Sequence, residues 1–490
     1  MPPRKTNRAL TVVGLLLALA MAALEATVVA TAMPTVIGDL GGIDQYAWVA
    51  TAYLLTSAVT VPIYGKLADM YGRKPVLLFG IATFLIGSAA SGASRSMAAL
   101  IAFRALQGLG AGAMQPMAVT VVGDIFDVEE RSRMQGLFGA SWGFFGLVGP
   151  MLGGVIVEAL SWRWVFYINI PFGVAAAALV ITSLHEEVER RRRAIDVPGA
   201  LLLAAGTGAL LFAGHRAGGP GTLSAAGAAL VLFAAFVAVE RRAAEPVLPL
   251  ALFARPVLLT SSLTGAIIGG AMIATLTYVP LFVQGVLRGS PTDASSSITP
   301  MVVGWPVAAA VSGRLIPRVG FRPLIRAGLF VTASAGLGLA LFAAGGTLNG
   351  LRLITLLFGV GMGLSNTALV IAVQSSVEWH ERGVATASTM FFRTLGGLLA
   401  VGALGGVINA ALAEDPSLPI EDASRLLTPE GAQRLGPALV GRLGQALGEG
   451  LGTAFWIIAV MGILGFVVAL GFPRIPVDAK AKVEGGEPPG

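Results

Sequence analysis

Long apolar runs recur along the whole chain and constrain its fold more than any other feature. About 20 mostly apolar residues can cross a bilayer as a helix, and in lipid a helix satisfies its own backbone hydrogen bonds. Of the 490 residues, 55% are hydrophobic and only 12% are charged, whereas a soluble domain has about 25% charged residues. The sequence therefore predicts an all-α membrane protein.

Fourteen such runs can be counted, and each predicts one transmembrane helix. They lie near residues 10–32, 46–66, 75–92, 98–122, 134–157, 163–184, 196–214, 222–240, 257–284, 296–316, 323–344, 351–376, 383–411 and 451–472. The first run follows basic residues, as in a signal peptide, but it is too long for one. We expect it to remain in the chain as the first helix.

Basic residues in the loops indicate the orientation. Lys and Arg collect on the cytoplasmic side of membrane proteins, and the segments on the same side as the N-terminus are the richer ones, as at Lys66, Arg73 and Lys74. Both termini are therefore expected in the cytoplasm, and the Arg-rich, Ala-rich composition favours a bacterial cytoplasmic (inner) membrane. The net charge of +6 is spread over short loops, so nucleic acid is not an expected partner.

The outer segment 412–450, before the last helix, is the longest polar stretch of the chain. Leucines recur in it near helical spacing from Leu435 to Leu447. This pattern predicts a short amphipathic helix over the outer mouth or the membrane surface. A disordered hairpin is the alternative.

The two ends of the chain resemble each other. Gly108, Gly110 and Gly112 recur at one constant offset as Gly359, Gly361 and Gly363, and Glu130-Arg131 recurs as Glu381-Arg382. The repeat predicts a six-helix bundle over residues 1–190, two linking helices over residues 191–255 and a second six-helix bundle over residues 256–490. Parallel repeats of this kind occur in transporters; chance similarity between Gly-rich helices is the alternative.

Four sequence patterns lie in order on the expected helices. They are Gly65 to Lys74 after the second helix, Arg104 to Gly110 on the fourth, Gly139 to Gly154 on the fifth, and Trp162 to Gly173 at the sixth. Together they resemble the fourteen-helix drug:proton antiporter family (EmrB/QacA-like) of the major facilitator superfamily, over nearly the whole chain. The resemblance implies the major facilitator fold in a monomer, with no cofactor. The implied partners are a proton, a small lipophilic substrate or lipid, and membrane lipids.

Opposite charges lie four residues apart after the second predicted helix. Asp69 and Arg73 share a face if this segment forms a helical turn. The resemblance implies that this loop, with Gly65, Gly72 and the acid Asp124 at the foot of the fourth helix, is a conformational latch. An ion pair that forms in only one state shifts the balance between two states. A solvated loop that only orients the protein is the alternative.

Small residues recur every three or four positions on the fifth predicted helix. Such a stripe permits close helix packing, and a proline within it removes one backbone hydrogen bond. The resemblance implies an antiporter motif, and we expect a tight but mobile seam between the bundles, with plain packing as the alternative. The motif comprises Gly139, Gly143, Gly146, Gly149, Pro150, Gly153 and Gly154.

Three charged residues lie well inside predicted helices, where charges are costly and usually functional. Glu25 and Arg104 lie at similar depths, so they can pair if their helices are neighbours, as the resemblance implies. Glu25 is the candidate proton carrier and Arg104 its modulator, because a guanidinium does not release its proton. A static ion pair is the alternative. Arg393, near the midplane, is a candidate for binding an anionic headgroup, or equally for packing and gating.

Uncharged polar and aromatic residues complete the predicted site. Besides Arg393, the candidates for a substrate cavity are Gln107, Trp142, Asn366, Tyr53 and Tyr278. Helix packing and hydrogen bonds between helices are the alternatives for these residues. The chain has no Cys and three His, so a metal site is not expected. The sequence also contains no nucleophile–base pair and no phosphate-binding loop, so we do not expect an enzyme.

These patterns predict proton-coupled efflux of hydrophobic or amphipathic compounds. Export of a lipid or lipopeptide by the same fold is the first alternative, and Arg393 would suit an anionic headgroup. Solute uptake by symport and a non-transporting membrane sensor are the others.

Overall fold

The computed structural model describes residues 6–126, 128–186, 196–215, 221–243, 250–342, 346–377, 382–415 and 420–475, with Pro246, Leu248 and Leu418. Within these residues every regular element is a helix, as predicted. The predicted bundle boundary at residues 190 and 191 lies outside the described residues.

The first half of the chain runs up and down as long helices joined by short turns. Its elements are α1 (Arg8–Leu40), η1 (Ile43–Gln45), α2 (Tyr46–Tyr71), α3 (Arg73–Gly92), α4 (Met97–Ile125), α5 (Val128–Ala159), α6 (Trp164–Tyr167) and α7 (Asn169–Ser183). The next two helices, α8 (Val197–His215) and α9 (Thr222–Glu240), pack against each other.

The rest of the chain repeats this arrangement and adds a small helical segment. Its elements are η2 (Leu250–Ala254), α10 (Pro256–Gly285), α11 (Pro291–Val319), α12 (Phe321–Phe342), α13 (Leu348–Ser375), α14 (Arg382–Ala413), α15 (Ile420–Ala423), η4 (Ser424–Leu427), α16 (Pro429–Leu435) and α17 (Pro437–Leu470).

All fourteen predicted regions are helical, and twelve contain helices long and apolar enough to cross a bilayer. The other two regions have shorter apolar segments within the described part, Gly143–Ala159 in α5 and Val197–Ala213 in α8. With about 1.5 Å of rise per residue, such a segment covers roughly 25 Å, less than the ~30 Å of a bilayer core. α5 as a whole has 32 residues, which is long enough to cross a bilayer core.

The predicted short helix over Leu435–Leu447 is wrong. Leu435 is the last residue of the short helix α16, and α17 begins at Pro437 and continues to Leu470, so the later leucines of the pattern belong to the first turns of α17. Leu443 and Leu447 are fully buried, because this end of α17 packs on α10, where Leu447 contacts Gly285. The outer segment is consequently shorter than 412–450: it begins after Ala413 and ends before α17.

Matching glycines make matching contacts in the two halves. Gly110 of α4 lies against the backbone of Gly80 in α3, and Gly361 of α13 lies against the backbone of Gly328 in α12. The same correspondence relates Gly108 with Tyr53 to Gly359 with Met301. These contacts occur at equivalent positions of the sequence repeat, so the two halves share their close helix packing as well as their motifs.

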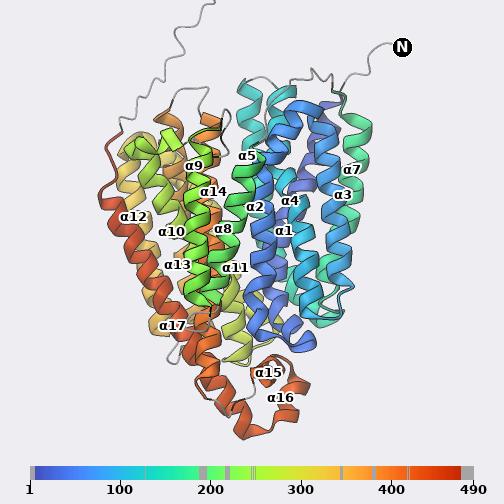
Figure 1. Cartoon of the computed structure of the whole chain (residues 1–490), viewed down its shortest axis with the longest axis vertical. Helices are drawn as coiled ribbons and strands as arrows, with labels where there is room; N and C mark the ends of the chain where they lie inside the picture. The colour runs from blue at the N-terminus through green and yellow to red at the C-terminus, as the bar shows by residue number, and fades with distance from the viewer. Residues whose placement is uncertain are drawn as a thin grey trace, which may run out of the picture.

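Figure 1 shows the long helices standing side by side, with α15 and α16 at one end. We call this the far end, and the opposite end, where α1 begins and α17 finishes, the termini end. α8 contacts α2 of the first half and α14 of the second. α8 therefore lies across the junction between the halves, and α9 packs on α8.

The two halves are joined at the far end by polar contacts. Thr35 of α1 donates to Gln284 of α10 at 3.3 Å, and Gln284 donates to the carbonyl of Thr31 at 3.4 Å. Asn409 of α14 donates to the carbonyl of Asp44 in η1 at 2.8 Å. Both bundles are therefore closed against each other at this end.

The close glycine contacts generate a stability prediction. We expect Gly110→Ala to lower the apparent Tm of the purified protein, because the new methyl group would overlap the backbone of α3. Overpacking of this kind costs about 1–3 kcal/mol. Tryptophan fluorescence during heating in detergent measures the change.

Gly227→Ala in α9 is the matched control, because no atom lies within 4 Å of a methyl group at that position. This substitution should leave the apparent Tm unchanged or raise it slightly, since Ala favours helix over Gly. Equal Tm values for both variants would show that the α3–α4 contact tolerates a side chain.

Candidate functional site

Glu25 is a carboxylate almost completely buried near the middle of α1, with 2% of its surface exposed. It lies about 25 Å from the start of the helix at 1.5 Å of rise per residue. α1 begins at an N-cap in which the side chain of Asn7 accepts from the backbone N–H of Leu10, and it continues through apolar residues on all sides. A charge at this depth requires partners within the protein.

Three side chains donate hydrogen bonds to the two oxygens of Glu25. Arg104 Nη1 donates to Oε1 and forms an ion pair with it. Gln107 Nε2 and Asn169 Nδ2 donate to Oε2 at 2.8 and 3.0 Å. Arg104 and Gln107 lie three residues apart on α4, so they share a face, and Asn169 begins α7. The carboxylate therefore joins three helices.

Ser88 of α3 extends this network. Its Oγ accepts from Gln107 and Asn169 at 3.2 and 3.1 Å and donates to the carbonyl of Phe166 at 2.8 Å. Sequence analysis did not select Ser88, and it treated Asn169 only as part of a motif. A small polar residue within an apolar run is a weak signal, because such residues also bond to their own helix.

Arg104 is itself held by several groups. Its Nη1 donates to Gln107 Oε1 at 2.7 Å, and its Nε donates to the carbonyl of Val49 at 3.3 Å. The guanidinium carbon lies 4.3 Å from the centre of the Tyr53 ring, a distance typical of a cation–π contact. Tyr53 and Gln107, predicted to line a substrate cavity, thus contact the buried ion pair in this structure.

We call Glu25, Ser88, Arg104, Gln107 and Asn169 the Glu25 cluster. Every donor that reaches Glu25 stabilises the charged carboxylate. Removing one member of a buried ion pair costs about 3–5 kcal/mol, because the other charge stays buried without compensation. Glu25 and Arg104 therefore each provide the opposite charge that the other requires at this depth.

The predicted latch is partly assembled at the termini end. Arg73 Nε lies 3.0 Å from Asp124 Oδ2, with side chains 27% and 46% exposed. Gly72 joins α2 to α3 with φ of 97°, a conformation that glycine adopts without strain. No atom lies within 4 Å of a methyl group placed on Gly65, and the Asp69 side chain lies outside the described part of the chain.

Glu186 is a further member of this region that sequence analysis missed. Its two carboxylate oxygens accept the backbone N–H groups of Arg73 and Lys74 at 2.9 and 3.0 Å. It thereby caps the start of α3, where an anion is favoured by the helix dipole. Glu186 follows α7, far from Arg73 in the sequence, so no spacing pattern indicates the contact.

The small residues of α5 face two different helices. Gly143 and Gly146 approach Pro306 and Val302 of α11, and Gly154 approaches Ser295 of the same helix. Ser295 also donates its hydroxyl to the carbonyl of Pro150. This part of the stripe lies between the two halves of the molecule.

The other glycines of the stripe pack within the first half. Gly149 and Gly153 approach Thr27 and Thr31 of α1, close in sequence to Glu25. Gly139 lies outside the part of α5 whose surroundings the structure describes. α5 therefore contacts both the helix of the buried carboxylate and the opposite half.

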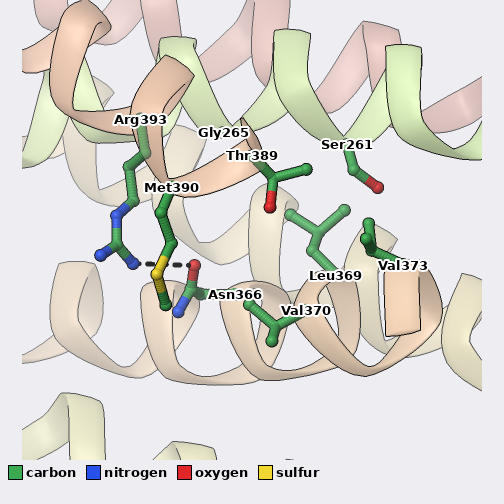
Figure 2. A pocket seen from close by; sticks show the side chains of 9 residues that line it. All are labelled: Ser261, Gly265, Asn366, Leu369, Val370, Val373, Thr389, Met390 and Arg393. Atoms are coloured by element: carbon green, nitrogen blue, oxygen red, sulfur yellow. Dashed lines mark hydrogen bonds between the residues drawn. The ribbon is translucent and has the colours of Figure 1, made fainter. Parts of the chain in front are cut away.

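Arg393 lines a cavity in the second half (Figure 2). Its volume of about 310 Å³ includes space open to solvent. Asn366 of α13 accepts a hydrogen bond from Arg393 Nη1 at 3.3 Å, so two of the residues predicted for a substrate cavity meet here. Ser261, Leu369, Val370 and Met390 also line it.

The remaining predicted cavity residues are elsewhere. Tyr278 is fully buried, donates its hydroxyl to the carbonyl of Val401 at 2.6 Å and lies 5.7 Å from the ring of Tyr46, so in this conformation it packs between helices. The side chain of Trp142 lies outside the described residues. Among the residues that the structure describes, no cluster of three His, Cys, Asp or Glu could hold a metal ion.

Comparison with known proteins agrees with this architecture. Residues 15–401 match the model of the Major Facilitator Superfamily. The multidrug transporter protein MdtP of Bacillus subtilis (strain 168) is 37% identical over 417 residues, which cover 83% of this chain and 76% of that protein. The tetracenomycin C resistance and export protein of Streptomyces glaucescens is 30% identical over 496 residues, covering 95% of this chain and 91% of that protein.

A solved structure shows the same fold at low sequence identity. It is a bacterial homolog of the human lysosomal transporter Spinster in an inward-facing, unoccupied conformation. Its TM-score is 0.67 at 15% identity, and the alignment covers 95% of this chain and 97% of that chain. Family model, relatives and fold agree that the chain belongs to the major facilitator superfamily, as a multi-pass membrane transporter and not an enzyme.

Proposed function

We propose that the protein exports hydrophobic or amphipathic small molecules in exchange for protons. Two relatives that are 30% or more identical over most of this chain are named as a multidrug transporter and as a tetracenomycin C resistance and export protein, which supports export. The observation that carries proton coupling is Glu25, a carboxylate buried within the membrane-spanning part of the chain with an arginine as its ion-pair partner.

The proposal includes a transport cycle in which two bundles, residues 1–190 and 256–490, move relative to each other. The far-end contacts described above close one side, and we take the termini end as cytoplasmic, in a bacterial inner membrane with fourteen spans. Access would then alternate across the α5–α11 seam, where Gly143, Gly146 and Gly154 permit close approach.

Glu25 would exchange its proton as this seam moves. α5 contacts α1 through Gly149 and Gly153 and contacts α11 in the other half, so a shift of α5 can be passed to the helix of Glu25. A small displacement of α1 from α4 would lengthen the contact with Arg104. A buried carboxyl group without its cation favours the protonated form, so separation loads the proton and renewed pairing releases it.

Glu25→Gln tests proton coupling. We expect it to reduce efflux driven by a pH gradient to the level of protein-free liposomes, because a glutamine side chain carries no exchangeable acidic proton. Proteoliposomes loaded with a neutral, a cationic or an anionic fluorescent dye provide the measurement. Wild-type efflux rates for Glu25→Gln would eliminate Glu25 as the carrier.

The double variant Glu25→Gln/Arg104→Gln separates a proton carrier from a static ion pair. It removes both buried charges and leaves no uncompensated one. If Glu25 carries the proton, the double variant stays inactive although its Tm recovers relative to Glu25→Gln. Recovery of pH-driven efflux together with Tm would mean that the pair serves only stability.

Asp124→Asn tests the latch. The Arg73–Asp124 pair is partly exposed, so it stabilises the conformation that contains it by only about 0.2–1 kcal/mol. Loss of this free energy changes the ratio of two conformers by no more than about fivefold. The chain has no Cys, so a single cysteine at Ser261 reports access to the second-half cavity through its alkylation rate. We expect a change of up to about fivefold.

Asp422→Asn is the matched control, since it removes the acid of another exposed ion pair, with Arg425 in the outer segment. This variant should leave the alkylation rate at Ser261 unchanged. Identical rates for wild type and both variants would show that the Arg73–Asp124 pair does not influence the conformational equilibrium.

A further inference from the structure

Unlike Arg104, Arg393 has no acidic partner among the residues that the structure describes. It lies on α14, about 16 Å from the start of the helix by its rise per residue, and its side chain is half-buried. Its hydrogen bond to Asn366 Oδ1 is 3.3 Å long. Within the described ranges no carboxylate lies at ion-pair distance from it, whereas Arg104 has Glu25. The cavity at Arg393 thus contains a cation without a counter-ion.

Close packing holds Arg393 in place. Gly265 and Gly269 of α10 lie against α14 at this residue, and a methyl group on Gly269 would lie 2.5 Å from Arg393 Cγ. Figure 2 shows the guanidinium on the side of α14 that faces α13, with Met390 beside it. The position of the charge is therefore set by the α10–α14 contact before any ligand arrives.

The cavity offers a second hydrogen-bond donor. Ser261 of α10 lines it, and its hydroxyl is buried with no hydrogen-bond partner among the described residues. A buried polar group without a partner is costly, and a bound oxyanion would provide one. The Asn366 side chain adds an amide N–H₂ group, because its oxygen already accepts from Arg393.

The rest of the wall is apolar. Leu369, Val370, Val373 and Met390 line the cavity beside these polar groups. The volume of about 310 Å³ includes space open to solvent, so a charged group can reach Arg393 while the apolar body of the ligand lies along the apolar wall towards the opening. A cationic cargo would instead meet the guanidinium at short range, without a carboxylate in the lining.

We propose that this cavity binds the oxyanion group of an amphipathic cargo, with the charge on Arg393 and Ser261 and the apolar body against α13. The inference rests on the proposed export function, which it deepens by assigning the cargo class. The same chemistry, a carboxylate, sulfonate or phosphate on an apolar body, could come from an exported small molecule or from an anionic lipid headgroup.

A matched series of three probes tests the proposal without any transport. The probes are naphthalene-2-carboxylate, 2-naphthalenemethanol and 2-naphthylmethylammonium, which share an apolar body and differ in charge. Calorimetry with the purified protein in neutral detergent should show that the carboxylate binds at least about 10-fold more tightly than the other two, as expected for charge-assisted hydrogen bonds.

Variants identify the group responsible. Arg393→Met should remove the preference for the carboxylate, and Arg393→Lys should retain most of it. Ser261→Ala should weaken carboxylate binding alone, and it tests the site independently should Arg393→Met fail to fold. Arg352→Met is the matched control, because Arg352 lies at the far end of α13 and bonds to Asn349 and Ser296. Equal affinities for the three probes, or an unchanged preference in both Arg393→Met and Ser261→Ala, would overturn the proposal.

Nanodiscs distinguish the two sources of the anion. If the site takes a cargo molecule, carboxylate binding should be the same in phosphatidylcholine and in phosphatidylglycerol discs. If an anionic lipid occupies it, phosphatidylglycerol should weaken probe binding in the wild type, and Arg393→Met should abolish this competition. Binding requires no pH gradient, so the two proposals can fail separately. Charge-selective binding without pH-driven efflux would refute the proposed function and leave this inference standing. Efflux without charge-selective binding would refute this inference and leave the proposed function standing.

Discussion

The buried contact between Glu25 and Arg104 is the interaction on which the first half of the molecule depends. Neither charge is tolerated alone at that depth in a membrane. Further hydrogen bonds join the pair to α2, α4 and α7, and Ser88 of α3 joins the network through Gln107. A pair that is satisfied from so many directions fixes the relative rotation of these helices, because turning any one of them breaks a hydrogen bond that water cannot replace.

The repeat of the fold does not extend to its charges. Gly110 with Gly80 and Gly361 with Gly328 show that the two halves use the same close packing, yet among the residues that the structure describes only the first half contains a buried ion pair. The second half contains Arg393 without an acid. The two halves therefore combine similar backbone packing with two chemically different surroundings for their buried charges, an ion pair at Arg104 and a hydrogen bond to Asn366 at Arg393.

The parts of this structure that could be predicted are those set by local physics. The length of the apolar runs predicted every long helix. The fixed rise per residue of a helix predicted that Glu25 and Arg104 lie at matching depths. The start of α17 was missed because Leu443 and Leu447 look like one face of a surface helix, and only the position of α10 shows that they are buried. Ser88 and Glu186 were missed because their contacts depend on how distant helices rotate and where a loop returns.

The two sites have a joint electrostatic consequence for transport. The three charges that sequence analysis found deep within helices sum to one positive charge, because Glu25 cancels Arg104 and leaves Arg393. An oxyanion bound at Arg393 would bring this sum to zero. Moving an anion out of the cell and moving a proton in both transfer positive charge inward. The membrane potential contributes about 2.3 kcal/mol per charge per 100 mV to each movement. A cargo with a negative charge would thus be driven by the potential as well as by the pH gradient, so a single proton-accepting carboxylate could suffice for its export.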